Sequence, residues 1–232
     1  VTLSVTWGLP QFAKIVAFKL PPTAMDKISR DALAMFDKRF FKPSDLPEDK
    51  KANIRKAFLQ LTRETGKDRT FSLQFRKSKT IGANAFALPS GVIIITDDLV
   101  KTSQDLREIQ GVLVHEISHI THRHAVRAVI QNTGVVLLIS LLAGDVSSIT
   151  SLAASIPTLL LESGYSRGFE IEADAAVAVY FLNKGWPLKS YEDILMRIVK
   201  DPAQSGHSDI FSTHPDLKER IERLKTYSTS AE

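Results

Sequence analysis

The sequence predicts an α+β domain that is predominantly helical, with a small β-sheet next to a helix that carries a His-Glu-x-x-His motif. Apolar residues recur at helical spacing along most of the 232 residues. The period shortens from about 3.6 to 2 only between Phe71 and Thr96, where short strands are expected. The motif spans His115 to His119 and lies within the helical pattern that follows these strands.

The composition is that of an ordinary globular domain. Hydrophobic residues form 44% and charged residues 24% of the chain, which is long enough to bury one sizeable core. We predict a single domain over residues 1–232, with an N-terminal arm and helical segment in 1–66 and the core in 67–232. Basic residues are interleaved with acidic ones and give a net charge of +4, so no nucleic-acid partner is expected. Cysteine is absent, which excludes disulfides, zinc–thiolate sites and cysteine nucleophiles.

The N-terminal segment is rich in apolar residues up to Pro22. We expect an arm that packs on the core; the alternative is a stub after a membrane anchor, since the first residue is Val rather than Met. The longest apolar run, Val135 to Ala143, has nine residues, about half of a membrane span. A membrane anchor, if the native protein has one, is therefore expected outside this chain.

Helices and strands are expected in a definite order along the rest of the chain. Before the motif come a helix over 23–40 with Thr23 as its N-cap, a helix capped by Ser44 or Asp45 that ends near Gly66, strands at 71–76 and 92–96, and an extended segment over 80–88 between them. Thr102 or Asp105 caps the long helix that holds the motif. The apolar stretches 135–143 and 149–161 predict short helices or a flap, and helices are expected over 165–183, 190–200 and 215–225, with a loop over 202–215.

The spacing of the motif suits a metal ion. His115 and His119 are four residues apart, so both imidazoles lie on one helix face and can reach one ion. Glu116 then lies beside the metal, where it can take a proton from a bound water without being a ligand. A catalytic zinc needs a third protein ligand, which must be His, Asp or Glu in a chain without cysteine.

The segment Ser166 to Asp174 is the best source of that ligand. Glu170 and Asp174 lie on one face of a helix, while Glu172 projects about 200° away from Glu170. We expect Glu170 to bind the metal and Asp174 to accept a hydrogen bond from the outer nitrogen of a ligating histidine. On spacing alone, these carboxylates fit the surface of an amphipathic helix equally well.

His-Glu-x-x-His, followed some fifty residues later by Ser-Arg-x-x-Glu-x-x-Ala-Asp, resembles the M48 family of zinc metallopeptidases. Further matches are Asn84 to Gly91 before the motif, and Ser212-Thr213-His214-Pro215 with Arg220 after it. The resemblance implies a zincin-like metalloprotease domain with one Zn²⁺, bound by His115, His119 and Glu170, with Glu116 as base and Asp174 behind a ligand. It also implies that His214 lies near the metal, where in periplasmic members it can fill the open position as an inhibitory ligand.

Three other histidines are less informative. His122 fits a solvated histidine, or one that supports the site, better than a ligand. His124 is expected on the opposite side of the same helix from His115, as a structural residue. His207 has no motif around it and is expected on the surface.

Together these features predict a zinc-dependent endopeptidase that hydrolyses unfolded or flexible proteins. His214 and Arg220 are candidate donors to the oxyanion of the transition state, and Asn84 to Ala87 could form a sheet edge that pairs with substrate. The resemblance implies a role in protein quality control at the bacterial cell envelope, periplasmic or membrane-associated. The alternative is a chaperone-like or binding module that keeps zinc only as a structural element.

Overall fold

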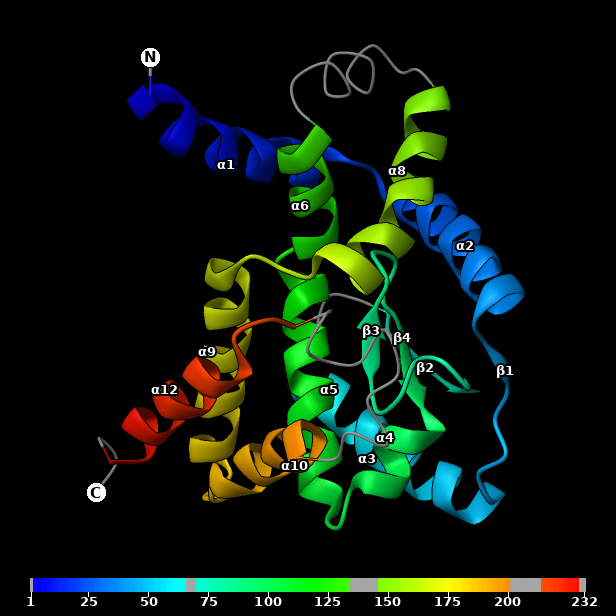
Figure 1. Ribbon diagram of the computed structural model, residues 1–232, viewed down its shortest axis with the longest axis vertical. Helices are drawn as coiled ribbons and strands as arrows, with labels where there is room; N and C mark the ends of the chain where they lie inside the picture. The colour runs from blue at the N-terminus through cyan, green and yellow to red at the C-terminus, as the bar shows by residue number, and fades with distance from the viewer. Residues whose placement is uncertain (1, 66–69, 134–145, 201–213, 230–232) are drawn as a thin grey trace.

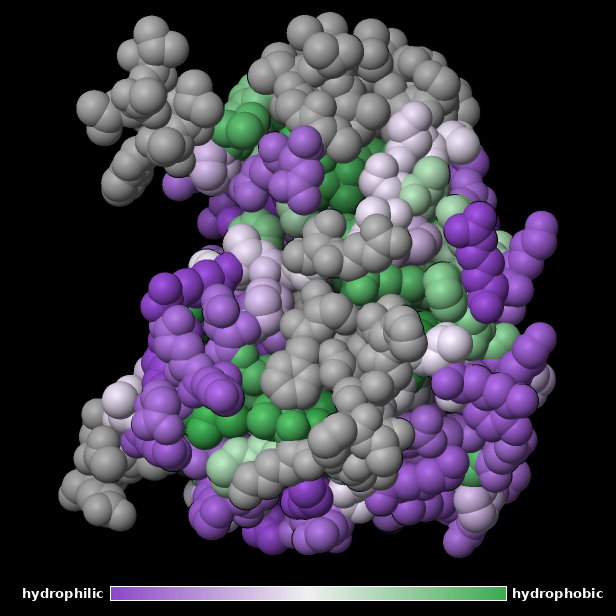
Figure 2. Space-filling view, in the orientation of Figure 1, coloured by the Kyte–Doolittle hydropathy of each residue, from purple (hydrophilic) through white to green (hydrophobic). Residues whose placement is uncertain are grey.

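The predicted α+β, predominantly helical fold is confirmed by the computed structural model, which describes residues 2–65, 70–133, 146–200 and 214–229. A small sheet lies beside the central helix α5, and the other helices surround this pair (Figure 1). Figure 2 shows hydrophilic side chains along the left and lower margins of one face, with apolar residues coming to the surface between them. Within the described ranges, no helix is both long and apolar enough to cross a membrane.

The sheet has four strands in the order β1-β2-β4-β3. β2 (Ser72–Lys77) pairs in parallel with β4 (Val92–Thr96), while β1 (Lys42–Pro43) and β3 (Ala85–Ala87) add antiparallel edges. The run of β-branched residues in β4 predicted a strand buried on both faces, and this is confirmed: Ile93 and Ile95 face one core, and Ile94 faces another. The core around Ile93 contains residues of α5, so the sheet fixes one side of the motif helix.

Three helices precede the paired strands. α1 (Thr2–Lys19) was expected only as an arm; it is a helix that contains Pro10 and buries Ala13, Val16 and Ala17. α2 (Pro22–Arg39) begins with a proline at its first position, where the missing N–H is not needed, so Thr23 is not its cap.

The predicted start of the next helix was also wrong. α3 (Glu48–Thr65) begins after Ser44 and Asp45, which bind Asp97 instead: the Ser44 hydroxyl donates to its carboxylate over 2.6 Å, and the Asp45 N–H over 2.8 Å. Ser44 and Asp45 thus bind a residue that is distant in the sequence instead of capping the next helix, and local spacing does not reveal this contact.

The motif helix is shorter than expected. After α4 (Asp97–Thr102), α5 (Leu106–Thr121) begins with Asp105 as its N-cap, as predicted. It ends before His124 because Arg123 takes a φ of 55°, and a new helix, α6 (His124–Thr133), begins there. The expectation that His124 shares a helix with His115 is therefore wrong.

The part of the chain described after α6 adds four α-helices, of which the second and third pack on α5. α8 (Val146–Thr158) continues into a π-helical turn (Leu159–Ser163), and α9 (Arg167–Asn183), α10 (Lys189–Lys200) and α12 (Leu217–Thr229) follow. The first apolar stretch, 135–143, and His207 fall outside the described residues. Gly111 lets α10 approach α5 closely: a Cβ at this position would lie 2.7 Å from Cδ2 of Tyr191.

Candidate metal centre

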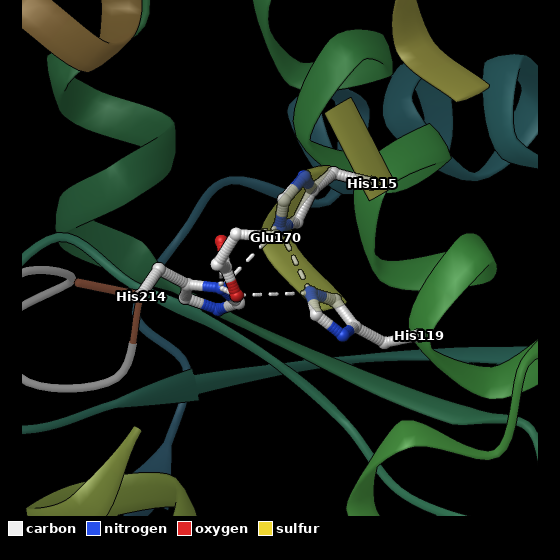
Figure 3. A group of neighbouring side chains, drawn as sticks. All are labelled: His115, His119, Glu170 and His214. Atoms are coloured by element: carbon white, nitrogen blue, oxygen red, sulfur yellow. Dashed lines mark hydrogen bonds and ion pairs between the residues drawn. The ribbon is translucent and has the colours of Figure 1, made fainter. Parts of the chain in front are cut away.

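Four buried side chains meet beside α5. His115 and His119 come from α5, Glu170 from the first turn of α9, and His214 from the segment before α12 (Figure 3). Each offers one nitrogen or oxygen atom, and these atoms all lie within 4.8 Å of one another. The structure thus brings together the three residues predicted as ligands from sequence spacing, and His214 joins them.

The spacing of these atoms fits a tetrahedral zinc ion. The two Nε2 atoms of His115 and His119 are 2.9 Å apart, and Glu170 oxygens lie 3.3 Å and 3.4 Å from them. His214 Nδ1 lies 3.3 Å from His115 Nε2 and 3.1 Å from Glu170 Oε1. Ligand atoms at a usual zinc–nitrogen distance would be about 3.3 Å apart at the corners of a tetrahedron. Two or three imidazoles with one carboxylate are also a donor set that zinc prefers.

Glu116 follows His115 on α5, and its carboxylate lies next to this group. Its Oε1 is 3.4 Å from His214 Nε2, whereas its buried Oε2 has no hydrogen-bond partner among the described residues. Burial raises the pKa of the Glu116 carboxyl, so the group is more basic than a surface glutamate. An unpaired, buried carboxylate oxygen beside a metal-binding group is a ready acceptor for a proton from water.

Asp174, Arg220 and Tyr191 form a buried network behind His115. Asp174 Oδ1 is 3.0 Å from His115 Nδ1, as expected for an acceptor at the outer ring nitrogen. Arg220 donates to both oxygens of Asp174 over 2.7 Å and 2.8 Å, and its Nη1 is 2.7 Å from Glu170 Oε2. The Tyr191 hydroxyl lies 3.1 Å from His115 Nδ1 and accepts from Arg220.

The charges of this network shift the pKa values of Glu170, Asp174 and His115. Burial opposes ionisation of Glu170, but Arg220 and the neighbouring histidines hold its pKa well below the usual range. The same guanidinium lowers the pKa of Asp174 against its burial. Burial and Arg220 would lower the pKa of His115, but Glu170 and Asp174 raise it to about 9. The carboxylates are therefore ionised and can attract a cation.

A different set of groups lies behind His119. Its Nδ1 is 2.9 Å from Nδ1 of His124, and the ring of Tyr165 stacks on it with the centroids 3.9 Å apart. The buried Tyr165 hydroxyl has no partner among the described residues, and burial raises its pKa well above 10. The other ring nitrogen of His124 lies 2.7 Å from Glu172.

Sequence reasoning missed four of these residues: Tyr165, Tyr191, His124 and Glu172. Tyr191 has no motif around it, and only the close approach at Gly111 places it at the site. His124 and Glu172 meet because the helix breaks at Arg123. The 200° separation of Glu172 from Glu170 was a usable signal, since it directs Glu172 away from the four-donor group. His122 takes no part in that group; it contacts the Ser118 carbonyl at 3.0 Å.

Comparison with known proteins agrees with this geometry. The model of Peptidase family M48 matches residues 48–228. A protease HtpX homolog of Dictyoglomus thermophilum is 31% identical, covering 61% of this chain and 59% of its own length. The mitochondrial metalloendopeptidase OMA1 of Arabidopsis thaliana is 28% identical over 61% of this chain and 28% of its own length. The β-barrel assembly-enhancing protease of Yersinia pestis is 26% identical over 64% and 34%.

The chain thus spans about three-fifths or less of these three relatives. The family match nevertheless includes every residue of the four-donor group, Glu116 and the network behind them. The chain belongs to peptidase family M48, the zinc metallopeptidases.

Proposed function

We propose that this chain is the catalytic part of a zinc metalloendopeptidase that binds one Zn²⁺. His115, His119 and Glu170 are the ligands, Glu116 is the general base, and Asp174 holds His115 by its outer nitrogen. The unpaired Oε2 of Glu116 beside the four-donor group is the observation that carries the proposal, because a purely structural metal site has no use for a base there.

The chain's own groups divide the reaction between them. Bound zinc would polarise a water molecule and the scissile carbonyl. Glu116 takes the proton of the attacking water and delivers it to the leaving amine. Arg220 holds Glu170 and Asp174 in place from behind, and this contact supports a positioning role more strongly than the oxyanion contact expected from the sequence. Tyr165, whose buried hydroxyl is unpaired among the described residues, is a further candidate donor to the oxyanion.

His214 is the control point of the proposed site. Its Nδ1 is the fourth donor of the group and would take the position where a catalytic zinc keeps water, and its Nε2 lies 3.4 Å from Glu116. In this arrangement water and substrate must displace His214 before Glu116 can act. We expect His214→Ala to raise the basal rate of casein cleavage at unchanged zinc content; a lower rate would instead assign His214 a role in the transition state.

The substrates are proposed to be unfolded or flexible segments of proteins. β3 is an edge strand that packs against α5, and its residues are buried, so an extended peptide could add to it and pass the four-donor group only after this edge is uncovered. The name of the Yersinia relative, a β-barrel assembly-enhancing protease, supports a place at the bacterial cell envelope. We propose that any membrane association uses a segment outside this chain.

The alternative, a binding or chaperone-like module with structural zinc, has one observation in its favour, since four protein donors make a closed site. Zinc analysis and cleavage of casein by wild type and Glu116→Gln separate the two. We expect both proteins to hold one zinc and the variant to lose at least about a hundredfold in rate. Equal rates would contradict the peptidase, and zinc in neither protein would contradict the metal site.

A further inference from the structure

Two imidazoles and a carboxylate form a chain of contacts behind the metal-facing side of His119. His119 Nδ1 lies 2.9 Å from His124 Nδ1, and His124 Nε2 lies 2.7 Å from Glu172 Oε2. We infer that His124 and Glu172 are positioning residues that fix the tautomer and orientation of His119. This inference rests on the proposed zinc site and names the residues that orient its second histidine, His119.

The contacts that run from Glu172 through His124 to His119 form a relay. The order of donors and acceptors along it follows from the carboxylate of Glu172 at its outer end. A carboxylate only accepts, so the proton between Glu172 and His124 lies on His124 Nε2. A neutral imidazole with its proton on Nε2 accepts at Nδ1, so His119 donates from its own Nδ1. The lone pair of His119 Nε2 is then directed at the four-donor group, as metal binding requires.

The fold holds His124 in one place by several contacts. Its ring is fully buried and stacks on Phe169, with the centroids 4.3 Å apart and the planes at 9°. The preceding residue, Arg123, turns the chain out of α5 with a φ of 55° and donates to the carbonyls of Ala17 and Leu20. A left-handed backbone is unfavourable for arginine, so this turn needs such ties. Without it, His124 would continue α5 and face away from His119.

Glu172 is held at the outer end of the relay. Arg127 donates to the same oxygen, Oε2, over 3.2 Å, and its guanidinium lies over the Phe169 ring at 4.4 Å. The Glu172 side chain is 39% exposed and lines a surface cavity of about 670 Å³ together with His122 and Tyr180. The relay therefore runs from a partly solvated carboxylate to a fully buried ligand.

Two substitutions at His124 test the inference in the full chain. His124→Phe keeps the stacking on Phe169 but removes the acceptor, so zinc affinity measured by competition with a chelator should fall about 10- to 100-fold. His124→Asn restores an acceptor oxygen close to the position of Nδ1, and it should recover part of this loss. Glu64→Gln, which changes a partly exposed carboxylate of the same cavity that is paired with Lys184 rather than with His124, should leave zinc affinity unchanged.

Nitrogen-15 NMR of histidine-labelled protein provides a readout that packing alone would not move. We expect the proton of His124 on Nε2 and that of His119 on Nδ1, with or without zinc. A proton on His124 Nδ1, or equal zinc affinity of wild type and His124→Phe, would overturn the inference. Wild type that shows the expected tautomers but binds no zinc would contradict the proposed function while leaving the relay intact.

Discussion

The two histidines of α5 that we propose as ligands, His115 and His119, are supported by opposite kinds of environment. His115 meets an ionised carboxylate directly, and Asp174, Arg220 and Tyr191 behind it are all buried. His119 meets a second imidazole, and the carboxylate of its relay is one step further away and partly exposed. The charged groups behind His115 are thus buried in the fold, whereas the carboxylate behind His119 is partly exposed to solvent. Substitutions behind His115 should therefore lower the folding stability, whereas substitutions behind His119 should affect mainly zinc binding.

The largest difference should come from Arg220. Arg220→Met leaves Glu170 and Asp174 as buried carboxylates without their cation, and removing one partner of such a group costs about 3–5 kcal/mol of folding stability. Denaturant unfolding of the metal-free chain measures this cost. The matched change on the other side, Arg127→Met, removes a cation from the partly exposed Glu172 and should cost less than about 1 kcal/mol. Equal costs would remove the distinction between the two supports.

An intermediate effect is expected at Gly111, which shapes the support of His115 without touching the metal group. In Gly111→Ala the new methyl group would press on Tyr191 at 2.7 Å, and such overpacking costs about 1–3 kcal/mol. Gly168→Ala is a suitable control on α9, since its methyl group would meet only the Ser166 hydroxyl at 4.0 Å. Thermal unfolding of the two variants should therefore differ; a Gly111→Ala protein as stable as the control would show that Tyr191 can move freely.

The smallest difference between the two supports is expected when their carboxylates become amides. Asp174→Asn removes the charge that touches His115 and should weaken zinc binding about 10- to 100-fold, while Glu172→Gln keeps an acceptor for His124 and should cost less than about tenfold. Chelator competition gives both values under one set of conditions. A greater loss for Glu172→Gln would mean that the exposed support dominates the metal site.

The sequence predicted the first contacts of the metal centre better than their supports. The i, i+4 spacing, a rule that acts within one element, placed His115 with His119 and Glu170 with Asp174, and the resemblance to the family then favoured Glu170 as a ligand. Most of the helices after α1, the buried strand Val92–Thr96 and Asp105 as one of two candidate N-caps of α5 were likewise predicted from local patterns. His124 was misplaced because a positive φ at a single arginine ends α5, and neither propensity nor periodicity marks this residue.

The sequence also did not predict contacts between segments that are distant along the chain. The ties from Arg123 to Ala17 and Leu20, and from Ser44 to Asp97, connect parts of the chain that no local pattern relates. The extent of the single domain, with its division at residue 66, stays a prediction, although the family match begins within α3.

X-ray absorption at the zinc edge of the zinc-loaded wild-type chain tests the metal centre most directly. The geometry predicts four nitrogen or oxygen neighbours at about 2.0–2.2 Å, three of them with the outer-shell scattering of imidazole. In His214→Ala one imidazole should be replaced by a water oxygen with the other three donors unchanged. Five or six neighbours in wild type, or a spectrum that His119→Ala leaves unchanged, would contradict the metal centre described for this protein.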